Sequence, residues 1–455
     1  MRGAGGARGA VRVVGLVVGV CVVAGALPMA PAAASGQAAA AGRAVPATER
    51  VSVAADRTQG NGFSGDPTLS ANGRFVAFTS EATNLGPTDT NGHQDVYVKD
   101  LRTGKVDLVS VAGDGTPGDA LSGSPEISAD GRYVAFYSSA TNLVPGDTNG
   151  EGDVFVHDRR TGRTTSPTAG AGKSPYGYGV QNFALSGDGH RLAFGSYRPD
   201  LVPGDTNERL DIFVHDVQKG TTRRVSVASD GTQADGPSAF PSISADGRRI
   251  AFTSKATNLT PAGPGFRRPP PQDPLYVHDL ATGRTRVASL STTGAVVGVS
   301  PSPRLSPDGR YAVFSALAAD VVPDDTNGTY DLFARDLERG TTRLLSRAHD
   351  GTQGNGWSSD GRLDAGNRRL FFTSAATNLV PGDTNGQVDG FVRDLRTGQV
   401  ERINVGADGG QSASWTNTAA PDAAGRLAAF DSRDDGLVPG DTNGTGDVFV
   451  RRLEH

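Results

Sequence analysis

Short runs of alternating apolar and polar residues, bounded by Gly, Asp and Asn, recur along the chain. Arg132–Phe136 and Asp153–His157 are two such runs, rich in β-branched and aromatic residues. Runs of this length that end in turn residues are typical of β-strands. Two further short runs, such as Pro125–Ser128 and Thr222–Val227, accompany them. The pattern therefore predicts a repeating unit of four strands, and helical spacing is absent throughout.

The four-stranded unit recurs seven times. Its second strand carries an aromatic residue at Phe78, Phe136, Phe194, Phe252, Phe314, Phe372 and Phe430, and its third strand at Tyr97, Phe155, Phe213, Tyr276, Phe333, Phe391 and Phe449. Successive members of the first column are 58 residues apart, except for one interval of 62. Units of this length fill residues 48–455 and leave no room for another domain. Four-stranded units repeated in this way are typical of β-propeller blades.

The ends of the repeat region predict how the ring closes. Glu49–Val53 matches the fourth strand of the other units, and Asp447–Val450 matches the third. The N-terminal segment is therefore expected to supply the outer strand of the last blade, which removes a free sheet edge. An open solenoid would need capping repeats, and none is visible. The predicted fold is all-β: a seven-bladed propeller of four-stranded antiparallel blades, closed by the N-terminal strand.

A tight turn follows the first strand of each unit. Its glycine, for example Gly131, is replaced in the sixth unit by Asn367. Asn is the other residue that tolerates positive φ, so the substitution indicates a left-handed backbone position in a hairpin turn.

The segments around this turn, Ile127–Phe136 and Leu305–Arg310, share the pattern S-x-D-G-R. They resemble the WD40-like repeat of TolB-type propellers, and the resemblance covers about 400 residues. The family implies secretion and the binding of a protein or ligand, but no particular activity. The α/β domain that precedes the propeller in TolB has no counterpart in this sequence.

The N-terminal segment reads as a targeting signal. Arg2, Arg8 and Arg12 precede an apolar stretch, and small residues continue to Ala34. This order is typical of a secretory signal peptide. We expect residues 1–34 to be removed, residues 35–47 to form a disordered Ala/Gly/Pro-rich leader, and the protein to be secreted or associated with the cell envelope. No membrane span is expected after cleavage.

Composition excludes several other functions. The formal net charge is −5, without the basic footprint of a nucleic-acid binder. The lone cysteine, Cys21, lies in the predicted signal peptide, so neither a disulfide framework nor a Cys-based metal site is expected. The 62 Gly and 27 Pro of 455 residues agree with a turn-rich chain without long helices.

An Asp-x-Asn-Gly-type loop lies between the second and third strands of six units. Oxygen side chains at its first, third and seventh positions suit Ca²⁺; alternatively, they form an Asx-turn in which the last Asp opens the third strand. Both interpretations stay open at this point. The residues are Asp89, Asn91, Asp95; Asp147, Asn149, Asp153; Asp205, Asn207, Asp211; Asp325, Asn327, Asp331; Asp383, Asn385, Asp389; and Asp441, Asn443, Asp447.

No catalytic set is evident. The histidines of the third strand share their column with Lys and Arg, so we expect this column to be solvated or paired with neighbouring Asp residues. The chain has no G-x-S-x-G elbow. In the column two residues before the first-strand Ser, the only charges are Glu126, Arg304 and Arg362, which is little material for an active site.

The fourth unit lacks the Asp loop and has a longer Pro-rich segment there instead. Phe266, Arg267 and Arg268 in this segment could form a recognition element, and drift of a surface loop is the alternative.

Together these features predict a secreted, monomeric, non-catalytic binding or scaffold propeller, stabilised by calcium if the Asp loops bind it. Its expected partner is an unidentified protein or an extracellular ligand. The alternative function is a hydrolase or lyase that acts at the mouth of the propeller channel.

Overall fold

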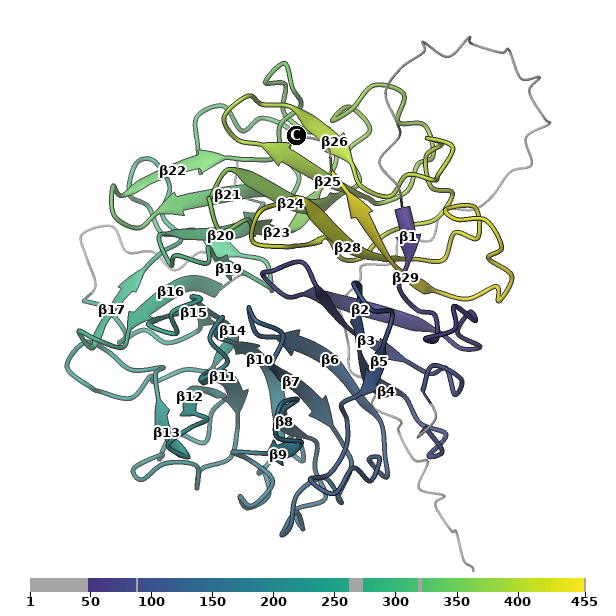
Figure 1. Cartoon of the computed structure of the whole chain (residues 1–455). Coiled ribbons are helices and arrows are strands. Elements are labelled where there is room, and N and C mark those ends of the chain that lie inside the picture. Colours follow the sequence, from purple (N-terminus) through teal and green to yellow (C-terminus); the bar gives the residue numbers. More distant parts are fainter. Residues whose placement is uncertain (1–47, 87–88, 262–272, 318–320, 454–455) are drawn as a thin grey trace, which may run out of the picture. The chain divides into compact units, whose positions relative to one another are not determined.

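The structure is a computed structural model that describes residues 48–86, 89–261, 273–317 and 321–453. Every regular element in these ranges is a β-strand, and the strands form seven antiparallel sheets (Figure 1). No helix in the described part of the chain is long and apolar enough to cross a membrane. The predicted signal peptide and leader lie outside the described residues.

Each sheet is one blade, and in the first three blades the strands follow one another in chain order from the inner to the outer edge. Blade one contains β2 (Ser64–Leu69), β3 (Phe75–Ser80), β4 (Asp95–Asp100) and β5 (Val106–Leu108). Blade two contains β6 (Ser122–Ile127), β7 (Tyr133–Ser138), β8 (Asp153–Asp158) and β9 (Arg163–Thr165). Blade three contains β10 (Val180–Leu185), β11 (Arg191–Ser196), β12 (Asp211–Asp216) and β13 (Thr221–Arg224).

The remaining blades repeat this order. Blade four contains β14 (Ser238–Ile243), β15 (Arg249–Ser254), β16 (Asp273–Asp279) and β17 (Arg284–Val287), with β18 (Gly298–Val299) added against β16. Blade five contains β19 (Arg304–Leu305), β20 (Tyr311–Ala316), β21 (Asp331–Asp336) and β22 (Thr341–Leu344). Blade six contains β23 (Ser358–Leu363), β24 (Arg369–Ser374), β25 (Asp389–Asp394) and β26 (Val400–Arg402).

Blade seven joins the two ends of the repeat region. It contains β27 (Ala420–Pro421), β28 (Leu427–Ser432) and β29 (Asp447–Arg452), and its outer strand is β1 (Thr48–Arg50). β1 pairs antiparallel with β29, with Glu49 opposite Val450 (Figure 1). The predicted seven-bladed all-β propeller and its closure by the N-terminal strand are confirmed.

The two aromatic columns form the core of each blade. Phe136 and Phe155 sit opposite each other on β7 and β8, with ring centroids 5.7 Å apart and both side chains fully buried. Equivalent ring pairs recur in all seven blades. Burial of such side chains is the main source of stability in a sheet this short, since each strand spans only a few residues.

The predicted left-handed turn residue is also confirmed. Gly131 has φ 77° and its replacement in blade six, Asn367, has φ 52°. The inner strands add an unpredicted feature, because β2, β6, β10, β14 and β23 each contain a register shift typical of a β-bulge. The third residue of several of these strands has positive φ, for example Asp66 (51°) and Asp360 (49°).

Candidate functional site

Charged side chains of the inner strands meet at the centre of the ring. Arg304 of β19 lies between two acidic residues: its Nη1 is 3.5 Å from Glu126 Oε1 and its Nε is 3.8 Å from Asp360 Oδ1. Arg362 Nε lies 3.3 Å from Asp360 Oδ2 on the same strand, β23. Glu126 belongs to blade two and Arg304 to blade five, so this ion-pair network joins opposite sides of the ring.

The sequence analysis underestimated this cluster. It singled out Glu126, Arg304 and Arg362 but treated them as too few charges for a site. The structure adds Asp360 and Asp66, which occupy the bulge position of β23 and β2. A bulge re-aims the side chain of its extra residue, and a non-glycine residue at positive φ is typical of functional positions.

Asp431 of β28 completes the set. Asn417 Nδ2 donates a hydrogen bond of 3.2 Å to Asp431 Oδ2, whereas the buried Oδ1 has no hydrogen-bond partner. Burial, and after it the charge of Asp66, raise the pKa of Asp431 to about 6. Asp66 reaches solvent, but protein atoms surround it closely, and this desolvation raises its pKa although Arg362 acts in the opposite direction.

We call Asp66, Glu126, Arg304, Asp360, Arg362 and Asp431 the central site. It contains four carboxyl groups and two guanidinium groups, so acidic groups are in excess. Buried like charges without counter-charges are costly. The central site is therefore built to receive a ligand with a positively charged group or to hold a proton.

Large apolar side chains that are exposed or half-buried precede the inner strands of four consecutive blades, blades six, seven, one and two. Leu121, Trp357 and Trp415 each come shortly before an inner-strand segment, and their exposed fractions are 45%, 39% and 40%, which is high for large apolar side chains. Phe63 holds the equivalent place before β2. We call these four residues the rim. Leu121 also borders a hollow lined by Glu81, Gly92, His93 and Gln94.

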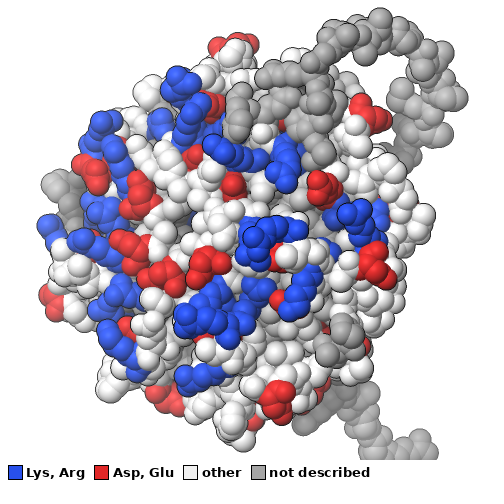
Figure 2. All heavy atoms as spheres, viewed as in Figure 1, with Lys and Arg blue, Asp and Glu red and all other residues white. Residues whose placement is uncertain are grey.

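Charge is mixed over the surface of the ring. Figure 2 shows Lys and Arg side by side with Asp and Glu on the face it draws. Part of this pattern comes from pairs that repeat between blades, such as Arg132 Nη2 with Asp158 Oδ2 at 2.6 Å and Arg310 Nη2 with Asp336 Oδ2 at 2.7 Å. The turn arginines of these blades thus pair with a neighbouring Asp residue.

The third-strand column is different from what we expected. His157 and His278 are not solvated but buried, and each Nδ1 shares a hydrogen bond with a threonine hydroxyl of the outer strand. Lys99 is also buried and donates to the carbonyl oxygen of Val53 at 2.7 Å. The two histidines thus join the third and outer strands of their own blades, and Lys99 holds the segment that follows β1.

The six Asp loops share one hydrogen-bond arrangement. The Asn Oδ1 accepts a bond from the backbone N–H two residues later, at 2.8 to 3.1 Å. The Asn Nδ2 donates to the last Asp, at 2.7 to 3.1 Å. The Asx-turn interpretation describes this geometry directly.

Other side chains already contact the loop carboxylates. Gln353 Nε2 donates to both Asp325 and Asp331, at 2.7 and 2.8 Å, and Gln59 and Gln233 bridge the equivalent pairs. Arginine guanidinium groups contact the first Asp in three loops: Arg50 with Asp441, Arg224 with Asp205 and Arg402 with Asp383.

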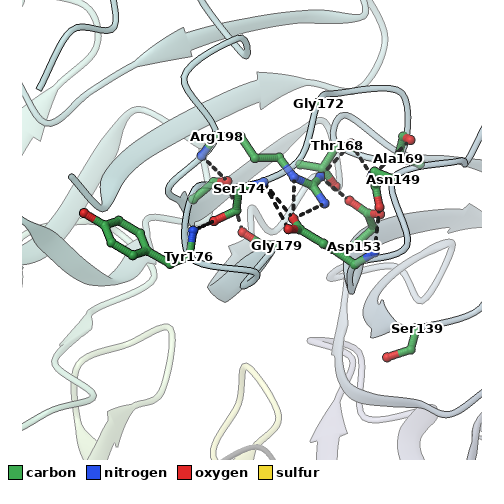
Figure 3. Close-up of polar contacts among 12 residues, drawn as sticks. Ser139, Asn149, Asp153, Thr168, Ala169, Gly172, Ser174, Tyr176, Gly179 and Arg198 are labelled. Atoms are coloured by element: carbon green, nitrogen blue, oxygen red, sulfur yellow. Dashed lines mark hydrogen bonds and ion pairs between the residues drawn. The ribbon is translucent and has the colours of Figure 1, made fainter. Parts of the chain in front are cut away.

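Blade two uses a different cation. Arg198 replaces the small residue that other blades have after the second strand, and its side chain is fully buried. Figure 3 shows it pointing at Asp153, to which Nη1 donates; Nη1 also donates to the Thr168 carbonyl at 2.6 Å. Its Nη2 lies 3.2 Å from Glu151 Oε2. A buried guanidinium thus pairs with Asp153 and Glu151, whereas the buried Oδ1 of Asp147 has no hydrogen-bond partner.

These contacts bear on the calcium interpretation. Four loops hold an arginine against their carboxylates, so a divalent cation does not fit there without displacing it. In the loops of blades one and five no arginine contacts the two carboxylates among the described residues, and one buried oxygen each of Asp89 and Asp325 has no hydrogen-bond partner. The described residues contain no group of three or more His, Cys, Asp or Glu that could hold a metal ion. The geometry therefore favours the Asx-turn interpretation, and the calcium interpretation is confined to the loops of blades one and five.

Three predicted partner-binding residues, Phe266, Arg267 and Arg268, lie outside the described residues. The other predicted site residues all lie on the Asp loops between the second and third strands, as the sequence indicated. Each loop is a separate site in its own blade. The rim and the two bulge carboxylates were missed. A signal for the bulge exists in the sequence, because Pro67, Pro125 and Pro241 interrupt inner strands, and Pro within a strand is typical of bulges and edges.

Comparison with known proteins supports the fold only. No protein-family model matches the sequence, and no curated protein gives a significant match. The β-propeller domain of the Trilobed protease from Pyrococcus furiosus is similar in structure, with a TM-score of 0.51 and 12% identity, over 86% of this chain and 94% of that one. An oligogalacturonate lyase in complex with manganese has a TM-score of 0.53 and 12% identity, over 90% and 93% of the two chains.

TolB from Acinetobacter baumannii is also among the similar structures, with a TM-score of 0.38 and 14% identity, over 86% of this chain and 79% of that one. The propeller that the sequence resemblance to TolB-type repeats implied is thus observed, and the assignment of the fold rests on the seven blades themselves.

Proposed function

We propose that this protein is a secreted, non-catalytic β-propeller that binds a protein or another extracellular ligand at the centre of its ring. One observation carries the proposal: Arg304 bridges Glu126 and Asp360 from opposite sides of the ring, beside two further carboxyl groups. The surface pairs of the turn arginines recur from blade to blade, whereas the described residues contain this central cluster once. The exposed rim around it supplies the apolar contacts that binding sites usually combine with a few polar groups.

The test compares ligand capture by matched variants. The immobilised protein is exposed to medium and cell-envelope extract of the producing organism, and bound molecules are identified by mass spectrometry. Glu126→Gln/Arg304→Gln removes both charges of the pair and keeps polar side chains at the two positions. We expect it to lose the ligand that the wild type retains. Arg310→Gln, which removes a repeated surface pair instead, is the matched control and should retain it.

A ligand that binds the wild type and both variants equally would contradict a site at the ring centre. Thermal melting of each variant must accompany the capture, so that a loss of fold is not mistaken for a loss of binding.

Catalysis at the same place is the second candidate. It is favoured by Asp431, whose pKa of about 6 lets the carboxyl group give or take a proton near neutral pH, close to the range that general acid–base catalysis needs. Assays on lactone, glycan and peptide panels test it. Turnover that Glu126→Ala and Asp431→Asn both abolish would replace the non-catalytic proposal with a hydrolase or lyase.

A further inference from the structure

The carboxyl groups of Asp66 and Asp431 stand apart from the other charges of the central site. Glu126 and Asp360 are both in contact with Arg304, and Asp360 also with Arg362. The Asp66 side chain has no hydrogen bond or ion pair to any described residue. Asp431 is only 6% exposed and its Oδ1 is unpartnered. Two adjacent carboxyl groups therefore form no ion pair with any described residue where blade seven meets blade one, and Arg362 acts on Asp66 only from a longer distance.

Aromatic rings flank the same corner. Phe63 lies three residues before Asp66, and its ring covers the start of β2 so closely that a Cβ on Gly65 would be 2.8 Å from it. Trp415 lies two residues before Asn417, whose amide holds Asp431. Phe63, Asp66, Trp415 and Asp431 are thus contributed by short segments of two neighbouring blades.

A cation already occupies part of this corner. The Arg433 guanidinium lies over both rings, 6.0 Å from the Phe63 centroid and 5.6 Å from the Trp415 centroid. Arg433 forms no ion pair with Asp66 or Asp431 among the described residues. The two rings therefore accept a positive group on their faces, as cation–π contacts do, while neither acidic residue beside them forms an ion pair with a described residue.

We propose that this corner binds an organic cation: an alkylammonium group of the kind that a lysine side chain or a small amine carries. Asp66 is its direct partner and Asp431 lies behind Asp66. Phe63 and Trp415 lie at the sides of the bound group. The proposal rests on the proposed function, since it names the ligand chemistry of the same site. A divalent metal fits less well, because Ca²⁺ takes six to eight oxygen ligands and two carboxyl groups with two aromatic rings supply few of them.

Both tryptophans of the chain lie in the rim, so intrinsic fluorescence reports on the site directly. In a Trp357→Phe background, Trp415 is the single reporter. We expect Nα-acetyl-lysine amide to change its emission in a saturable way, about tenfold more tightly than the neutral Nα-acetyl-norleucine amide. The binding should weaken as salt is raised. n-Butylammonium in a parallel titration distinguishes a free amine from a peptide side chain as the source of the group.

Three variants locate the binding. Asp66→Asn should weaken it about tenfold and still fold, because Asn is one of the few residues that accept the positive φ of this position. Arg433→Gln should strengthen it, since it frees the two rings. Asp435→Asn removes an exposed carboxyl group from the same blade outside the site and should leave the affinity unchanged.

Equal binding of the lysine and norleucine amides would overturn the inference. So would an unchanged affinity for the lysine amide in both Asp66→Asn and Asp431→Asn, or the same emission change with calcium chloride alone. If the amine does not bind while Glu126→Gln/Arg304→Gln still loses the captured ligand, this inference fails and the proposed function stands. If neither experiment shows binding at the ring centre, both fail.

Discussion

His157 and His278 occupy equivalent positions on β8 and β16. Each is 6% exposed, and each Nδ1 shares a hydrogen bond with a threonine hydroxyl of the outer strand, at 2.9 Å to Thr164 and 2.8 Å to Thr285. Burial, followed by the charge of a nearby arginine, lowers the pKa of both imidazoles to about 4. Both are therefore neutral in the folded protein at pH 7, and they act as packing groups with one hydrogen bond each.

This burial predicts a pH dependence of stability. In the unfolded chain the imidazoles have a pKa near 6.5, so between pH 6.5 and 4 the unfolded state binds more protons and the folded state loses stability as pH falls. The loss approaches about 3 kcal/mol per histidine at pH 4. We expect His157→Gln/His278→Gln to lose less stability than the wild type between pH 7 and 4.5, measured by urea unfolding.

His93→Gln is the matched control for this measurement, because His93 is exposed on a loop, and its pH profile should follow the wild type. Carboxyl groups with raised pKa, such as Asp95 and Asp147, increase the stability of the folded state as pH falls, but they do so equally in all three proteins. A double variant as acid-sensitive as the wild type would show that the two imidazoles are not buried as neutral groups.

Among the structural elements, the Asp loops show how far local sequence predicts geometry. The Asx-turn could be predicted as one of two interpretations of the sequence, because its donor and acceptor atoms belong to residues only a few positions apart. The groups that bridge its carboxylates were not predictable in this way. Gln59 reaches Asp441 across 382 positions of the chain, and the buried Arg198 enters the loop of the preceding blade. Such partners become neighbours only when the ring has formed.

The inner strands show the same limit. Their existence follows from the repeat, but the register shift that aims Asp66 and Asp360 depends on pairing with the second strand. Proline after the third residue hinted at this bulge in three blades and is absent at Asp360, where Gly361 follows. The charged residue types at the ring centre were thus partly visible in the sequence, whereas their convergence was not.

The loops also carry the calcium prediction. Burial raises the pKa of Asp95 to about 6 and that of Asp325 above its usual range, although side-chain hydrogen bonds from Ser110 and Gln353, respectively, act in the opposite direction. Amide and hydroxyl donors already satisfy most oxygens, for example Ser110 Oγ donating to Asp95 at 2.6 Å. We therefore expect the melting midpoint in millimolar Ca²⁺ to equal that in a chelator, because a ligand must bind the folded state to raise it.

A midpoint several degrees higher in Ca²⁺ would contradict this expectation and restore the calcium interpretation. The two loops without an arginine would then be responsible, and Asp89→Asn/Asp325→Asn should remove the shift. Asp205→Asn, in a loop whose first Asp faces Arg224, is the matched control and should leave it in place.

At the scale of the whole ring, closure brings together residues that the repeat period alone does not relate. The period of 58 predicted seven blades and their order. It did not predict that Glu126 and Arg304, 178 positions apart, would meet at the centre. That contact depends on the number of blades, since a ring of another size would place different blades opposite each other. The central site is accordingly a property of the closed ring and not of any one blade.

The joint between β1 and β29 maintains this closure without a covalent link. Val51 N–H donates to the Val448 carbonyl at 2.7 Å, Ser52 Oγ donates to Asp447, and Arg50 Nη2 lies 3.1 Å from Asp441 Oδ2. Residues 48–52 thus supply both the outer strand of blade seven and the cation that contacts its Asp loop. Their removal would expose the edge of β29 and leave two buried carboxylates without their guanidinium.

We therefore predict that a chain beginning at Ala54 melts at least about 5 °C below one beginning at Ser35, the predicted mature start, or aggregates through the exposed edge. Scanning calorimetry and light scattering measure the two outcomes.

Ser52→Ala and Ser110→Ala provide a matched pair, because both serines contact the last Asp of a loop, one across the joint and one within a continuous blade. If closure stabilises the whole ring, Ser52→Ala should also weaken amine binding at the corner of blades seven and one, whereas Ser110→Ala should not. Equal melting of the two truncated chains would mean that the six covalently continuous blades hold the ring without this joint.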